Sequence, residues 1–317
     1  MKPLTVSDKY LVESFLKRTS YEGYNYNFNS MMMWNHAYSI QYDVCEQYMI
    51  LQYQYKNLIF WLMPLCLPEY YEQAIVKMQQ ISRQEGIPFV LSYVEEPFKQ
   101  WMEEKYGTCF TYTSSPDYSE YVYSCERNRT LSGRKMVKRR NHFNAFLREH
   151  PDYVYKNLES EDLNEVRNCL IRWEQEKQTK ENTEMLRSEY KGIMELLKNF
   201  SRLDYQGGCI YLNGQMEAFI IGSALGKDSV EIHAEKANSQ IRGLYVAILK
   251  EFLSHHFPDT FWMNREEDLG YENLRKAKRQ LHPVRMVENY TCREMCCKKE
   301  SRKEHAHEKH NTCAAAS

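Results

Sequence analysis

A strand-like segment, residues 229–237 (SVEIHAEKA), carries ionisable side chains at alternate positions. Apolar residues at 230, 232 and 234 alternate with Glu231, His233 and Glu235, so one face is expected to be buried and the other polar. Imidazole and carboxylate groups can move a proton near neutral pH. The pattern therefore indicates Glu235 and His233 as candidate catalytic residues, and a merely solvated strand face is the alternative.

A second candidate is the turn that follows this strand, where residues 240–245 (QIRGLY) open a helix. A helix N-terminus offers free backbone N–H groups and a partial positive charge, and a glycine allows close approach of a ligand. The turn partly matches the Gln/Arg-x-x-Gly-x-Gly/Ala pyrophosphate loop of GNAT-type acyltransferases, with Tyr245 at the last small position. Gln240, Arg242 and Gly243 are therefore predicted to bind donor phosphate. The alternative is a glycine in the first turn of a packed helix.

A third candidate is the basic helix expected at 131–149. On a helical wheel Met136, Phe143 and Leu147 form an apolar stripe, and cations lie opposite it and along its border. Guanidinium groups match phosphate oxygens, and clustered cations reinforce one another. The predicted anion-binding residues here are Lys135, Lys138, Arg139, Arg140 and Asn141. A solvated face with arginines that bury only their stems is the alternative.

The fourth candidate spans residues 261–290, where three acids lie between a short strand and a basic helix. Open α/β sheets commonly bind ligands beyond the carboxyl ends of their strands. The predicted cleft loop comprises Asn264, Arg265, Glu266, Glu267 and Asp268. The helix that follows adds Arg275 and Lys278 to the predicted anion-binding set. Acids before a helix and cations along it also complement the helix dipole, which is the simpler explanation.

The segment from about residue 296 to 317 is rich in Cys, His and Lys and has no apolar periodicity, which is typical of a disordered tail. Its residue types suit zinc, but their spacing follows no usual ligand pattern, so no metal site is expected. The other cysteines are scattered without paired spacing. They are interpreted as buried free thiols in a reducing compartment, which indicates a cytoplasmic protein.

The elements that must position these residues form two series. The first comprises a helix at 5–19, strands at 38–44, 48–55 and 58–63, a helix at 68–85, a strand at 88–94, a helix at 96–105 and a strand at 118–124. The second comprises helices at 131–149, 161–178 and 184–200, a hairpin at 208–225 with Asn213-Gly214 at its turn, the strand 229–237, a helix at 240–256, a strand at 260–264, the basic helix and a strand at 284–290. The similar order predicts two α/β units, residues 1–128 and 129–295.

The composition excludes several classes of protein. The chain of 317 residues has 43% hydrophobic and 27% charged residues, as soluble globular proteins do. Its net charge of -1 means that anion binding must come from local patches. No segment reaches the roughly 20 apolar residues of a membrane span. The first residues contain Asp8 and Glu13 where a signal peptide would need an apolar core.

Several motifs resemble those of a known family. The segments LSGRKMVKRRNHFNAFL, EKANSQIRGLYVAILKEF, NREEDLGYENLRKAKRQLHPVRMVENY and FNSMMMWNHAYSIQY resemble soluble relatives of the C-terminal domain of bacterial phosphatidylglycerol lysyltransferases. The resemblance runs from about residue 5 to 292. It implies an α/β (α+β) fold of two tandem GNAT-like units, each with a mixed, mostly antiparallel sheet flanked by helices and a splayed pair of central strands.

The resemblance also implies an aminoacyl- or acyltransferase. Such an enzyme transfers an activated group from aminoacyl-tRNA or acyl-CoA to a lipid headgroup or another amine or hydroxyl, with no tightly bound cofactor. The protein would be cytoplasmic and could lie at the membrane periphery. The alternative from another class is a non-catalytic module that binds RNA or an anionic surface through the same cationic groove.

Overall fold

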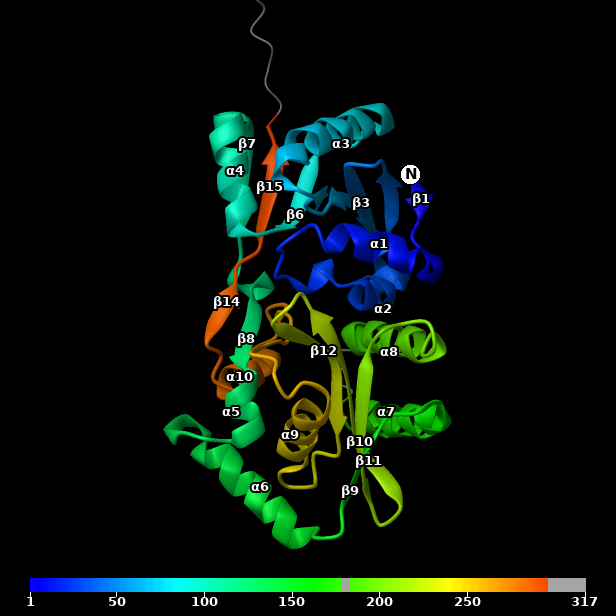
Figure 1. Ribbon diagram of the computed structural model, residues 1–317, viewed down its shortest axis with the longest axis vertical. Coiled ribbons are helices and arrows are strands. Elements are labelled where there is room, and N and C mark those ends of the chain that lie inside the picture. Colours follow the sequence, from blue (N-terminus) through cyan, green and yellow to red (C-terminus); the bar gives the residue numbers. More distant parts are fainter. Residues whose placement is uncertain (178–182, 296–317) are drawn as a thin grey trace, which may run out of the picture.

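The computed structural model describes residues 1–177 and 183–295. Two mixed β-sheets lie one above the other along the long axis, each with helices on its faces (Figure 1). The fold is therefore mixed α/β, as the sequence predicts.

The first sheet has the strand order β1-β2-β3-β4-β6-β15-β7, with β5 paired to β3. Its strands are β1 (Lys2–Pro3), β2 (Gln41–Val44), β3 (Tyr48–Tyr55), β4 (Leu58–Trp61), β5 (Leu65–Cys66), β6 (Val90–Val94), β7 (Phe110–Ser114) and β15 (Tyr290–Glu294). β4 and β6 are parallel and meet at one residue pair, Trp61 and Leu91, so these central strands diverge. The predicted strands at 48–55 and 58–63 are confirmed, whereas β7 was not predicted.

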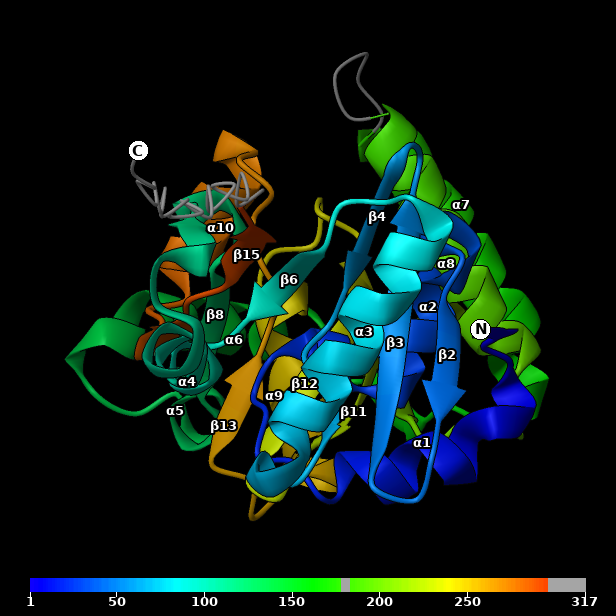
Figure 2. The same cartoon turned by 90° about the horizontal axis from the view of Figure 1, so that it is seen from above.

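Four helices flank this sheet: α1 (Lys9–Leu16), α2 (Phe28–Tyr38), α3 (Tyr71–Glu85) and α4 (Glu96–Tyr106). α3 covers the outer face, while α1 and α2 lie on the face toward the second sheet (Figures 1 and 2). α2 was not predicted, because residues 28–33 are buried on all sides and give no amphipathic period.

The second sheet has the order β14-β8-β13-β12-β11-β10-β9. Its strands are β8 (Glu120–Ser124), β9 (Val154–Asn157), β10 (Gln206–Leu212), β11 (Gln215–Leu225), β12 (Ser229–Ala237), β13 (Trp262–Asn264) and β14 (Arg285–Val287). Asn213 and Gly214 both have positive φ, as the predicted two-residue hairpin turn requires.

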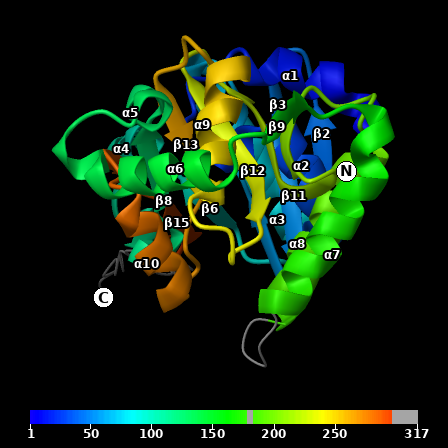
Figure 3. The same cartoon turned by 90° about the horizontal axis from the view of Figure 1, so that it is seen from below.

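The helices of this half are α5 (Cys125–Thr130), α6 (Val137–Glu149), α7 (Leu163–Lys177), α8 (Thr183–Lys198), α9 (Leu244–His256) and α10 (Glu272–Gln280). α9 packs on one face of the sheet with α6 against it, and α7 packs on the other face (Figures 1 and 3). α8 crosses α2 closely. A Cβ at Gly192 of α8 would lie 2.9 Å from the Met33 carbonyl oxygen, so only glycine permits this approach.

The two sheets exchange strands. β8 follows β7 along the chain but pairs with β13 and β14 of the second sheet. β15 follows β14 but inserts between β6 and β7 of the first sheet. The boundary expected at 128/129 therefore does not separate two self-contained sheets, and the strand predicted at 284–290 is two strands with a break at Glu288-Asn289.

Candidate active site

The candidate site is a fork between two strands of the second sheet. β12 and β13 pair in parallel only at 229–231 with 262–264, and then diverge. A cavity of about 830 Å³ opens beside the fork. It is lined by side chains from both halves, including Tyr24, Trp34, Tyr38, Lys135, Lys138, Arg139, His142, Trp173, Glu189, His233, Glu235, Lys236, Tyr245, Arg265, Glu266, Glu267, Leu274, Ala277, Lys278 and Leu281.

A bulge in β12 changes the predicted polar face. Ala234 pairs with Ile221 and Ile232 pairs with Gly222, so His233 is an extra residue without an opposite partner on β11. Paired residues share a face, and Glu235 pairs with Ile220 whereas Glu231 pairs with Ser223. Glu231 and Glu235 therefore lie on opposite faces of β12. The predicted regular alternation was wrong here, because one added residue inverts the face of every residue beyond it.

Glu235 lies in the cavity wall beside two arginines. Its Oε2 atom is 2.7 Å from Nη2 of Arg265, and its side chain is 5% exposed. Burial lowers the pKa of Arg139 to about 10, and the Glu235 carboxylate opposes this shift. The guanidinium nevertheless remains charged at neutral pH. Glu235, Arg139 and Arg265 thus form a compact charged group at the cavity surface.

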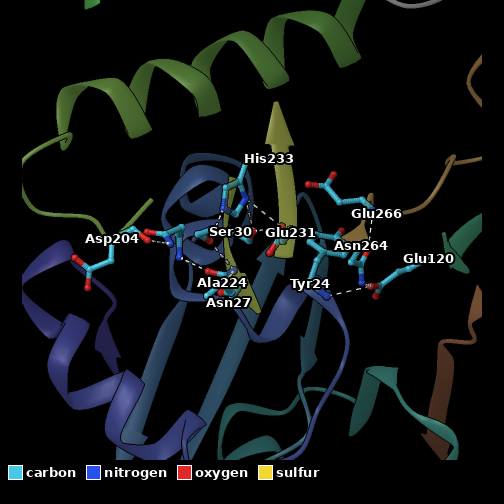
Figure 4. Close-up of polar contacts among 12 residues, drawn as sticks. Tyr24, Asn27, Ser30, Glu120, Asp204, Ala224, Glu231, His233, Asn264 and Glu266 are labelled. Atoms are coloured by element: carbon cyan, nitrogen blue, oxygen red, sulfur yellow. Dashed lines mark hydrogen bonds and ion pairs between the residues drawn. The ribbon is translucent and has the colours of Figure 1, made fainter. Parts of the chain in front are cut away.

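His233 is held at both ring nitrogens by residues behind the cavity (Figure 4). Nε2 is 2.8 Å from Ser223 Oγ, and Nδ1 is 3.1 Å from Ser30 Oγ and 3.2 Å from Glu231 Oε1. Ser30 belongs to α2 of the first half and donates to Glu231 Oε1. The imidazole therefore joins the two halves of the molecule and has no free nitrogen directed at a substrate.

A cluster of two carboxylates and an ammonium group forms another part of the wall. Lys278 Nζ donates to the backbone oxygens of Arg265, at 2.5 Å, and Glu267. Burial lowers the pKa of Lys278 to about 8, although the neighbouring Glu266 and Glu267 oppose the shift. Burial raises the pKa of both carboxyl groups, and the charge of Glu231 adds to this effect. Tyr24 donates from its hydroxyl to Glu267 Oε1 at 3.0 Å.

The structure brings only some of the predicted anion-binding residues to the cavity. Lys135, Lys138, Arg139 and Lys278 line it, the first two as exposed side chains. Arg140 instead donates from Nη1 to the Leu131 backbone oxygen at 2.6 Å, so it fixes the loop before α6. Exposed Asn141 does not line the cavity.

Arg275 was also wrongly placed among the anion-binding residues. Its Nε and Nη2 atoms donate to the two oxygens of Asp268 at 2.9 and 2.7 Å, and Nη2 also reaches Asp117 at 2.5 Å. The bidentate partner keeps the pKa of Asp268 at about 2, although burial opposes this. Arg275 and Asp268 therefore hold α10 in place and are not available to a ligand.

Only some residues of the predicted cleft loop line the cavity. Arg265, Glu266 and Glu267 line the cavity. Asn264 is buried and donates from Nδ2 to Glu120 Oε2 at 2.6 Å, so it supports the junction of the sheets. Of the three acids after β13, Glu266 and Glu267 thus line the cavity, whereas Asp268 binds Arg275. Their common charge did not distinguish these two roles in the sequence.

The predicted phosphate-binding turn is explained by packing. Gly243 precedes α9 with a φ of +85°, and a Cβ there would lie 2.2 Å from the His142 backbone oxygen of α6. Gln240 donates its backbone N–H to Asn238 Oδ1 at 3.0 Å. Gln240 and Arg242 are exposed, and neither they nor Gly243 line the cavity. The glycine is required by the contact between α6 and α9, which is the alternative stated for this turn.

Several cavity residues gave no signal in the sequence. Trp34 and Tyr38 come from the unpredicted helix α2, and Tyr24 precedes it. Lys236 lies 3.8 Å from the centre of the Trp173 ring and 2.7 Å from Glu189 Oε1. These residues are far apart in the chain, so no local spacing links them.

A second cavity, of about 1350 Å³, lies at the fork between β4 and β6 in the first half. Its wall includes the aromatic residues Tyr55, Phe60, Tyr93, Tyr118 and Tyr290 and the cations Lys56, Arg187, Lys191 and Arg293. Trp34, Tyr38, Met185 and Leu269 line both cavities.

Among residues 1–177 and 183–295, no helix combines the length and the apolar character that crossing a bilayer requires. The Cys/His-rich tail at 296–317 lies outside the described residues.

Three comparisons place the chain among known proteins. A conserved protein of unknown function from Bacteroides thetaiotaomicron VPI-5482 is 26% identical, with a TM-score of 0.88 over 93% of this chain and 99% of that one. L-PGS from Bacillus licheniformis has the same fold at 13% identity, with a TM-score of 0.64 over 90% of this chain and 92% of that one. An uncharacterized protein of Mycoplasmoides gallisepticum is 23% identical over 202 residues, which are 62% of this chain and 62% of that protein.

Both sheets contain the diverging central strands that the predicted tandem GNAT-like architecture requires. The model of the family described as "Phosphatidylglycerol lysyltransferase, C-terminal" matches residues 17–293. The match covers most of the described fold, and the chain therefore belongs to the phosphatidylglycerol lysyltransferase C-terminal family.

Proposed function

We propose that this protein is an aminoacyltransferase whose reaction takes place in the cavity at the β12–β13 fork. The observation that carries the proposal is the distribution of charge in that cavity. The exposed cations Lys135, just before α6, and Lys138, on α6, lie at its rim. Glu235, Glu266 and Glu267 lie deeper in its wall. This arrangement suits a donor with a polyanionic carrier and a small polar reacting group.

The rim favours aminoacyl-tRNA over acyl-CoA as the donor. Lys135, Lys138 and Arg139 lie within two turns of chain, and His142 is next to them. The pKa of His142 is lowered by burial and by the charges of Arg242, Lys138 and Arg139, which indicates a positive local potential. The packing of Gly243 against α6 removes the main support for a CoA pyrophosphate loop in this half.

The chemistry is an attack by an amine or hydroxyl of the acceptor on the ester carbonyl of the donor. A new C–N or C–O bond forms, the ester C–O bond to the tRNA ribose breaks, and a proton passes from the nucleophile toward the leaving oxygen. Proximity and fixed charges can accelerate such a transfer without a covalent enzyme intermediate. Glu235 is the predicted catalytic residue best placed to accept the proton, while Arg265 and Arg139 can stabilise the developing oxyanion.

His233 has a different place in this proposal. Because both ring nitrogens already contact serine hydroxyls, it positions β12 against α2 and is not the proton acceptor. The acceptor is an amine or hydroxyl compound, and a lipid headgroup is one member of that class, as the family's description suggests.

The test is transfer from labelled aminoacyl-tRNAs, with labelled acyl-CoAs as the competing donors. We expect label to leave tRNA in the presence of phosphatidylglycerol vesicles or small amines. Glu235→Gln keeps the side-chain shape and should slow transfer by about 10²–10⁴-fold while leaving tRNA binding unchanged. Glu195→Gln, on the exposed part of α8, is the matched control.

Tight tRNA binding without transfer to any acceptor would instead support a non-catalytic RNA-binding module. Transfer from acyl-CoA alone would contradict the choice of donor.

A further inference from the structure

Three potential metal ligands converge behind the cavity wall. One ligand atom each from Glu231, His233 and Glu266 lies within 4.8 Å of the other two. The shortest separation recorded, 3.2 Å, joins His233 Nδ1 and Glu231 Oε1. A zinc ion with bonds of about 2.0–2.2 Å holds neighbouring ligand atoms roughly 3–3.5 Å apart, so modest closure of Glu266 would complete the geometry.

Two buried carboxylate oxygens in this group lack a hydrogen bond. Glu231 is fully buried, and its Oε2 atom has no partner among the described residues. Glu266 Oε1 is likewise shielded from solvent and without a partner in the described part of the chain. Leaving such oxygens unpaired is unfavourable, and a cation bound by the two carboxylates would offset that cost.

The supporting contacts match those of a metal-bound histidine. Ser223 Oγ is 2.8 Å from His233 Nε2, and Asn27 Nδ2 donates to the same hydroxyl at 2.9 Å. Asn27 Oδ1 accepts from the Asn29 backbone N–H at 3.0 Å, which fixes the orientation of this amide. Histidine ligands usually donate their second ring N–H to a fixed acceptor, and here Ser223 Oγ takes that place. Nδ1 then carries the lone pair, and a metal bound there would replace the 3.1 Å contact between Nδ1 and Ser30 Oγ.

We propose that Glu231, His233 and Glu266 bind one divalent transition-metal ion, with Ser30, Ser223 and Asn27 holding the ligands in place. A set of one imidazole and two carboxylates suits Zn²⁺, Co²⁺ or Mn²⁺ better than Mg²⁺ or Ca²⁺, which prefer oxygen ligands alone. The ion enters from the cavity, since His233 and Glu266 line it. This proposal replaces the expectation of no metal site and does not depend on the proposed transfer reaction.

Titration of the full-length protein with Co²⁺, followed by visible absorption, tests the site. We expect one equivalent to produce d–d bands without a thiolate charge-transfer band, because the ligands are nitrogen and oxygen. Glu231→Gln retains an acceptor for Ser30 but loses the charged ligand, and should weaken Co²⁺ binding by more than about tenfold. Glu266→Gln should do the same.

Glu189→Gln is the control, because this carboxylate lines the same cavity outside the group of three ligands. It should leave the Co²⁺ affinity unchanged. The cysteines at 296, 297 and 313 offer an alternative source of binding, and only thiolate ligands give the charge-transfer band. Binding that shows this band and disappears after thiol alkylation would overturn the proposal. Equal affinity in the wild type, Glu231→Gln and Glu266→Gln proteins, or no Co²⁺ bound at all, would also overturn it.

Discussion

The side chain of Glu95 makes the stability of the protein depend on pH. Its Oε1 atom accepts the backbone N–H groups of Glu22 and Gly23 at 2.7 and 2.8 Å. Burial nevertheless raises its pKa from 4.5 to about 7, since these hydrogen bonds and the charge of Arg285 compensate only in part. The native state therefore holds a proton at Glu95 that the unfolded state has released above pH 4.5.

Because the folded pKa is the higher one, the stabilisation from Glu95 is complete below about pH 4.5 and is lost as pH rises to about 7. The free energy of unfolding should fall by about 1.4 kcal/mol per pH unit in this window from this group. Glu95→Gln keeps the accepting oxygen and should remove that contribution. Urea unfolding of both proteins between pH 5 and 8 measures the difference, and parallel curves would contradict it.

Gly243 permits a direct test of packing against ligand binding. Gly243→Ala adds a Cβ that would lie 2.2 Å from the His142 oxygen and also strains a φ of +85°. We expect a loss of about 2–4 kcal/mol in the free energy of unfolding. Gly226→Ala is the matched control, since its φ is +66° but nothing lies within 4 Å of the added atom.

Gly226→Ala should therefore cost only about 1 kcal/mol, the price of backbone strain alone. Equal losses in the two variants would show that the contact between α6 and α9 is not what demands glycine at 243. Donor binding by the folded fraction of Gly243→Ala should be normal, contrary to a phosphate-binding turn.

At the scale of elements, α6 shows that sequence position on a helix does not by itself identify a binding residue. Arg139 faces the cavity, whereas the adjacent Arg140 is bonded to the Leu131 backbone oxygen. Arg139→Ala should weaken tRNA binding and reduce the salt dependence by about one phosphate contact. Arg148→Ala, at the exposed end of α6, removes the same charge outside the cavity and should have little effect.

Binding isotherms at several salt concentrations provide the measurement. If Arg139→Ala and Arg148→Ala lower the slope equally, the cations of α6 act only as a diffuse positive surface.

The parts of the site that could be predicted were those encoded by residues close together in the sequence. The strand at 229–237 was predicted with its observed bounds, because β-branched and alternating residues mark a strand directly. The bulge at His233 was missed, since it arises from the pairing of β12 with β11 and leaves no trace in composition. Lys278 was predicted to bind anions with Arg275, but α10 turns its ammonium group toward two backbone oxygens that only the fold brings near.

At the scale of the whole molecule, we expect the exchanged strands to make the two halves unfold as one cooperative unit. Cys292 of β15 is fully buried and pairs with both Leu91 and Tyr112 of the first sheet, while β14 completes the edge of the second. Cys292→Asp buries an unpaired charge and should lower the free energy of unfolding by about 3 kcal/mol or more. Cys292→Ser, which adds only a small polar group, is the milder comparison.

Hydrogen exchange followed by mass spectrometry locates the effect. We expect Cys292→Asp to speed hydrogen exchange in β3 and in β11 together. The chain passes from β7 to β8 and from β14 to β15 between the two sheets, so unfolding of the first sheet should destabilise the second. Faster exchange confined to the first sheet would show that the halves unfold separately.

The insertion of β15 between β6 and β7 has a consequence during synthesis on the ribosome. β7 ends at residue 114 and its neighbour begins at residue 290, so at about 5–20 residues per second the nascent first sheet waits roughly 10–35 s for its missing strand. Throughout that interval the facing edges of β6 and β7 have no strand between them, and exposed edges pair readily with other chains. The first sheet thus begins to form first but is completed last. The edges of β6 and β7 must be kept from pairing with other chains while the second half is synthesised.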